Sequence, residues 1–189
     1  MTRSTLHHRA TRSHARVSST TQREPSIRAD FALPASQLPT LLTRMQATPV
    51  QLARVVLGAH QAMLTHRLMT GRSVLDHVAH LTETEALWHV RLGDLVSGAA
   101  VLRASHQSCE PRVEPRTADP AEVRSMLHTF YQARTALAQR IAEAPAMVHA
   151  VAALHPPLGM PVTLAGQCQM VLDHDQRHLG TISRLLLRD

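Results

Sequence analysis

The sequence predicts an all-α protein, a four-helix bundle with long connections between the helices. Two observations predict it. Apolar residues recur at helical spacing in four stretches between residues 36 and 188, and β-strand alternation is not sustained anywhere. Helix-capping residues and prolines mark where these stretches begin and end. With 189 residues, of which 44% are hydrophobic, the chain is long enough for one domain with a hydrophobic core.

The first predicted helix opens near Ser36 and extends through Leu57. Thr48-Pro49 is expected to restart or kink it, because proline suits the first turn of a helix but not its interior. Residues 59–72 are expected to form a looser connection.

The second predicted helix begins at Ser73, a cap residue to which Asp76 can reach back, and it stops at Gly98. Residues 99–118 include two prolines and are predicted to form a long loop. The third helix starts with Asp119 as its cap and Pro120 in its first turn.

The third helix is expected to end at Ala144-Pro145, because a proline disfavours helical backbone in the residue before it. A short apolar segment then leads to a turn over residues 155–161. Thr163 opens the last helix, which we expect to pack its apolar face inward as far as Leu186.

Residues 1–30 are predicted to be a disordered basic tail, and residues 31–189 the helical domain. The tail holds six arginines and two acidic residues but almost no large apolar side chains, so it cannot bury enough surface to fold. Its richness in Arg and Ser also resembles a transit peptide, although its apolar residues are too sparse for an amphipathic helix.

Composition argues against several classes of protein. The domain is nearly balanced in charge and the whole chain has four aromatic residues, so we expect no nucleic-acid binding. No run of about 18 apolar residues occurs, which argues against a membrane span. The two cysteines, Cys109 and Cys168, do not form a Cys-x-x-Cys pair and fit a reducing compartment. We therefore expect a cytoplasmic protein.

Three histidines are the candidate metal ligands. His174 and His178 stand four residues apart, so both leave the same face of the last predicted helix. His80 lies on the second predicted helix and is a candidate third ligand. In a chain with 14 histidines one such pair is expected by chance, so the pair alone is weak evidence. The alternative is that all three are partly buried helix residues with backbone or solvent partners.

The neighbouring residues resemble a known family. Ser73-Val-Leu-Asp-His-Val-Ala-His-Leu-Thr-Glu-Thr-Glu85 resembles the second-helix signature of the DinB-like four-helix proteins, the DinB/YfiT type. His174-Asp-Gln-Arg-His-Leu-Gly-Thr-Ile182 resembles their closing His-x-x-x-His segment, and the likeness covers most of residues 36–188. One position departs from it, because Arg72 stands where the family commonly has Trp. The resemblance implies that His80, His174 and His178 together bind one divalent metal ion.

The resemblance also implies a metal-dependent enzyme of bacterial type that acts on a small molecule. A thiol-related S-transferase or a hydrolase is expected, with a low-molecular-weight thiol as a candidate partner. Zinc or nickel is the expected metal, because three imidazoles leave coordination positions open. The alternative is a non-catalytic, stress-related helical protein whose metal is structural or absent. The sequence leaves open whether the chain forms a homodimer.

Other polar residues are weaker candidates. His77 is an alternative ligand to His80, although a solvated surface position is favoured. Three carboxylates are candidates to orient the ligands, although an exposed position is favoured for each: Asp175, Glu83 and Glu85. Two arginines are candidates to hold a carboxylate of the substrate, although a solvated helix face is favoured for both: Arg91 and Arg177. Cys168 and Trp88 are expected to fill the core.

Overall fold

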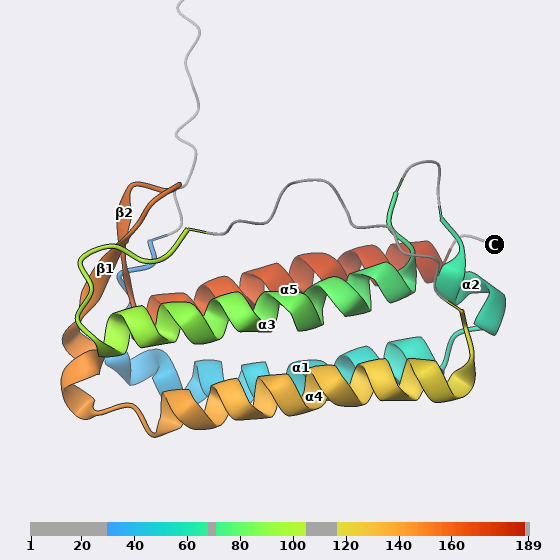
Figure 1. The fold of residues 1–189 in the computed structure, drawn as a ribbon, viewed down its shortest axis with the longest axis horizontal. Helices are drawn as coiled ribbons and strands as arrows, with labels where there is room; N and C mark the ends of the chain where they lie inside the picture. The colour runs from blue at the N-terminus through green and yellow to red at the C-terminus, as the bar shows by residue number, and fades with distance from the viewer. Residues whose placement is uncertain (1–29, 68–70, 105–116, 188–189) are drawn as a thin grey trace, which may run out of the picture.

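The computed structural model describes residues 30–67, 71–104 and 117–187 (Figure 1). The predicted all-α four-helix bundle is confirmed. Its long helices are α1 (Leu38–Leu57), α3 (Val74–Val96), α4 (Pro120–Ala142) and α5 (Leu164–Leu186). The shorter elements are the 3-10 helices η1 (Ala35–Gln37) and η2 (Ala146–Ala150), the helix α2 (Gln61–Thr65), and the strands β1 (Ala152–His155) and β2 (Met160–Thr163).

The order of the helices around the bundle decides which side chains can meet. α1 packs against α4 and α5, and α3 packs against the same two helices, so α1 and α3 lie on a diagonal although they are consecutive long helices. Figure 1 shows α3 and α5 side by side and running in opposite directions. The second and the last long helices are therefore neighbours, as a site shared between them requires.

The predicted starts of α3, α4 and α5 are confirmed by their caps. The Ser73 hydroxyl accepts a hydrogen bond from the Asp76 amide at 3.2 Å, and the Asp76 carboxylate accepts one from the Ser73 amide at 2.9 Å. Asp119 caps α4 through the Ala121 amide, and Thr163 caps α5 through the Gly166 amide. After the end of α3, Gly98 adopts φ of 71°, a conformation that favours glycine.

Pro49 does not restart the first helix. It lies inside α1, which continues from Leu38 to Leu57. Since proline has no amide hydrogen, the carbonyl oxygen of Met45, four residues earlier, lacks its usual helical donor. This oxygen instead lies 3.5 Å from Nη1 of Arg134 on α4, which donates to it.

A short helix and a β-hairpin were not predicted. α2 lies in the expected loose connection, and the turn predicted over residues 155–161 joins an antiparallel hairpin in which Ala152 pairs with Thr163 and His155 with Met160. Each strand has four residues, too few to show alternation in the sequence. The hairpin is also stabilised by distant chain, because Leu154 exchanges backbone hydrogen bonds with the segment that follows α3.

The apolar core has two parts. One lies toward the hairpin and includes Leu41, Trp88 and Leu172, and the other lies toward α2 and includes Val78 and Phe130. In the part of the chain that the structure describes, no helix is both long enough and apolar enough to cross a membrane.

Gly166 and Gly180, both on α5, provide a matched test of the fold. A Cβ at residue 166 would lie 1.7 Å from the carbonyl oxygen of Phe31, whereas a Cβ at residue 180 would meet nothing within 4 Å. We expect Gly166→Ala to displace the Phe31 segment and to lower the free energy of unfolding by about 1–3 kcal/mol. Gly180→Ala should raise it by about 0.5–1 kcal/mol. Urea denaturation measures both, and a stabilising Gly166→Ala would contradict the packing described here.

Candidate metal centre

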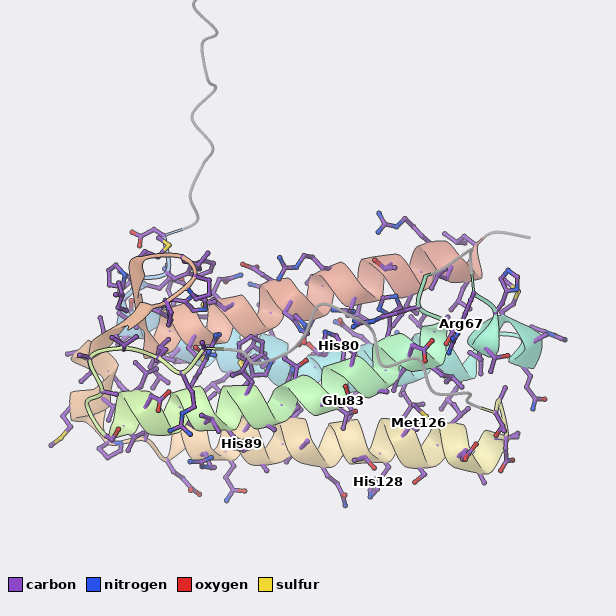
Figure 2. The ribbon with its side chains drawn as sticks, turned by 45° about the horizontal axis from the view of Figure 1, so that its top comes forward. Arg67, His80, Glu83, His89, Met126 and His128 are labelled. Atoms are coloured by element: carbon purple, nitrogen blue, oxygen red, sulfur yellow. The ribbon has the colours of Figure 1, made fainter. Side chains whose placement is uncertain are left out.

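His80, His174 and His178 converge between α3 and α5. Nε2 of His80 lies 3.3 Å from Nε2 of His174, and one ring nitrogen from each of the three histidines fits within 4.8 Å of the others. The ring centroid of His178 lies 4.8 Å from that of His80 and 4.6 Å from that of His174. Figure 2 shows His80 on α3, toward the side where α5 lies. The helical spacing of His174 and His178 and the adjacency of the two helices together produce this cluster.

The environment of His80 and His178 favours their neutral imidazole forms, which are the forms that bind metal. Burial lowers the pKa of His80 from 6.5 to about 4, with a further contribution from the positive charge of Arg72. Burial, followed by the neighbouring His174, lowers the pKa of His178 to about 3. Arg72, at the position where the family commonly has Trp, therefore adds positive charge near the site.

His77 is not a solvated surface residue, so that expectation was wrong. Its exposed fraction is 8%, and its Nδ1 lies 2.8 Å from Nδ1 of His178. The two rings meet edge to face, with centroids 5.0 Å apart. His77 is not a member of the group of three whose nitrogens converge. It is thus a buried neighbour of the cluster.

A buried ionic cluster lies beside the histidines. Nε and Nη2 of Arg134 donate to the Glu85 carboxylate at 3.1 and 2.5 Å, and Nη1 and Nη2 donate to the Asp175 carboxylate at 2.5 and 3.1 Å. The exposed side-chain fractions are only 1–2%. The exposed positions expected for Glu85 and Asp175 were therefore wrong, whereas Glu83 is exposed as expected.

This ionic cluster separates the two parts of the apolar core. Glu85 lies between Leu81 and Trp88 on α3, and Arg134 lies at the same kind of core position on α4. Burial lowers the pKa of Arg134, but the two carboxylates outweigh burial and raise it, so the guanidinium stays charged. Burial raises the pKa of Glu85.

Asp175 connects the ionic cluster to the histidines. It follows His174 directly, and its Oδ1 lies 3.9 Å from His174 Nδ1, too far for a hydrogen bond but close enough for attraction to a positive ring. Burial would raise the pKa of Asp175, but the adjacent His174 and the guanidinium of Arg134 outweigh burial and lower it. The cluster therefore places two carboxylates and one guanidinium beside the histidines.

The remaining candidates divide between core and surface. Trp88 and Cys168 are buried in the core as expected, and burial raises the pKa of the Cys168 thiol to about 12. Cys109 lies outside the described residues. Arg91 is buried rather than solvated: it lies over the Trp88 ring, and its Nε donates to the carbonyl oxygen of Arg103 at 3.0 Å. Arg177 is exposed as expected.

Three hollows lined by described residues lie away from the histidine cluster. One is on the outer side of α3 and α4, lined by residues that include Glu83 and Met126, both labelled in Figure 2. Two others lie near α2. None of these three contains His80, His174 or His178.

Comparison with known proteins identifies the fold. No protein-family model matches the chain, and no curated protein matches it in sequence. A solved structure does: YfiT from Bacillus subtilis, with a TM-score of 0.68 and 16% sequence identity over 81% of this chain and 87% of that one. The chain has the YfiT fold. YfiT is described as "a probable metal-dependent hydrolase with an unusual four-helix bundle topology". The resemblance to DinB-like proteins is thus confirmed at the level of the fold.

Arg134→Met tests the ionic cluster. The substitution leaves Glu85 and Asp175 buried without their cation, so we expect the free energy of unfolding at pH 7 to fall by about 3–5 kcal/mol. Arg124→Met, at an exposed position on the same helix, is the control and should change it by no more than about 0.5 kcal/mol. Urea denaturation gives both values. Equal stability of the two variants would show that the cluster does not hold the helices together.

Proposed function

We propose that this protein is a divalent-metal-dependent enzyme that acts on a small molecule, with His80, His174 and His178 as the ligands of one metal ion. The observation that carries the proposal is the convergence of the three imidazoles from two helices within 4.8 Å. Three nitrogen ligands suit zinc or nickel and leave positions open for water or substrate.

The surroundings of the three histidines support this proposal. The lowered pKa values of His80 and His178 keep both rings neutral near pH 7. Nδ1 of His174 is buried and makes no hydrogen bond within the described part of the chain, but the Asp175 carboxylate lies close to it. A bound cation would polarise this ring and strengthen its attraction to Asp175.

Hydrolysis is the reaction class that we favour. A divalent metal bound by three imidazoles supplies Lewis acidity, which makes water or a thiol a better nucleophile near neutral pH. The described thiol of this chain, Cys168, is buried with its pKa raised to about 12, so it is not a nucleophile at neutral pH. An S-transfer reaction would need an external low-molecular-weight thiol. YfiT, which has the same fold, is described as a probable hydrolase, and this favours water as the nucleophile.

Metal binding is the first test. After chelation and zinc titration of protein without a His-tag, we expect one zinc per chain by calorimetry. Replacing any one of the three ligands with alanine should weaken zinc binding strongly (His80→Ala, His174→Ala or His178→Ala). The loss should exceed the about 10–100-fold that results from removing an outer hydrogen-bond partner of a ligand. His128→Ala, an exposed histidine on α4, is the control and should leave affinity unchanged. Proton competition at His80 and His178 should begin near pH 4 and not near 6.5, because their pKa values are lowered.

The reaction class requires a second assay. Zinc- or nickel-loaded protein is screened against activated esters and amides, and separately against an electrophile with a panel of small thiols. We expect metal-dependent hydrolysis that is lost in His178→Ala. Turnover only with an added thiol would instead indicate S-transfer. Wild-type protein that binds metal but is inactive in both screens would favour the non-catalytic alternative. Wild-type protein that binds no divalent metal would overturn the proposal.

A further inference from the structure

His77 presents a fourth imidazole to the histidine cluster. It lies three residues before His80 on α3, and its side chain is buried against His178 of α5. The contact joins the same ring atom of both residues, Nδ1 to Nδ1, at 2.8 Å. That is a hydrogen-bond distance, and a hydrogen bond between two ring nitrogens requires one proton between them.

The position of this proton decides whether His178 can bind a metal. A neutral imidazole has one N–H, so one ring donates through Nδ1 and the other accepts through a bare Nδ1. If His178 donates, its Nε2 keeps a free lone pair. If His178 accepts, its Nε2 has the proton and is blocked, while its Nδ1 is already engaged with His77. Only the first arrangement leaves His178 a ligand.

Two further observations favour the arrangement in which His178 donates through Nδ1. His80 and His174 face each other through Nε2, and because Nδ1 of His178 faces His77, we expect His178 to offer its Nε2 to the same metal. The nearby carboxylates have other partners, since Asp76 bonds Ser73 and Arg67, and Asp175 bonds Arg134. The imidazole of His77 is thus in the place where many metal sites have a carboxylate or carbonyl that accepts the second N–H of a ligand.

We propose that His77 is a positioning residue that accepts a hydrogen bond from Nδ1–H of His178 and thereby holds His178 with its Nε2 free for the metal. This inference rests on the proposed metal function. In this role His77 is not itself a metal ligand, because it acts on the metal only through His178. It also gives a chemical reason for a buried histidine at this position.

The tautomer of His178 tests the inference without any metal. Long-range ¹H–¹⁵N spectra of the full chain, with chelator at pH 7.5, distinguish a ring protonated at Nδ1 from one protonated at Nε2. We expect Nδ1–H for His178 in the wild type. His77→Leu removes the acceptor, so His178 should shift toward Nε2–H. His77→Asn should retain Nδ1–H, because the asparagine amide places an acceptor near the former Nδ1. Nε2–H on His178 in the wild type would overturn the inference.

Zinc affinity of the same three proteins separates this inference from the proposed function. His77→Leu should bind zinc about 10–100-fold more weakly than wild type, and His77→Asn should recover most of that loss. Circular dichroism melting of the metal-free proteins controls for folding. Equal affinity of wild type and His77→Leu would overturn the role of His77 alone. A loss as large as that in His178→Ala, without rescue by Asn, would make His77 a ligand and also overturn its positioning role. Wild type that binds neither zinc nor nickel would overturn the proposed function itself.

Discussion

The guanidinium of Arg134 contacts all of the other three long helices at one level of the bundle. From α4 it bonds Glu85 of α3, Asp175 of α5 and, more weakly, the Met45 carbonyl of α1 that Pro49 leaves without a helical donor. Buried charges are costly unless they are paired and hydrogen-bonded, so these groups have to stay at the same height along the bundle. The apolar core on either side tolerates small shifts of one helix along another far better than this polar layer does.

The candidate site depends on that register. Asp175 directly follows His174, and Glu85 lies five residues after His80, so pairing both carboxylates with Arg134 also sets His80 against His174. The bundle order is equally important, because α3 and α5 have to be neighbours for their histidines to meet. The fold thus produces a cluster of three imidazoles next to a buried layer of two carboxylates and one guanidinium. That combination suits a divalent cation better than either part alone.

The sequence predicts the helix boundaries well because capping is local: Ser73, Asp119 and Thr163 each bond amides within three residues. The sequence does not predict features that depend on contacts between residues far apart in the chain. The hairpin has four-residue strands and pairs with chain far away in the sequence, so no local period indicates it. Arg134 interrupts the apolar stripe of α4 between Phe130 and Leu137, which was the available signal of a buried ionic group, but its partners are 41 and 49 residues away. The contact of His77 with His178, 101 residues apart, likewise follows from packing alone.

Diffraction from crystals grown with zinc, measured at the zinc absorption edge, tests the central claim most directly. We expect one anomalous peak between α3 and α5, about 2.0–2.1 Å from a ring nitrogen of each of His80, His174 and His178. A peak at other residues, or none at the histidine cluster in zinc-loaded protein, would contradict it.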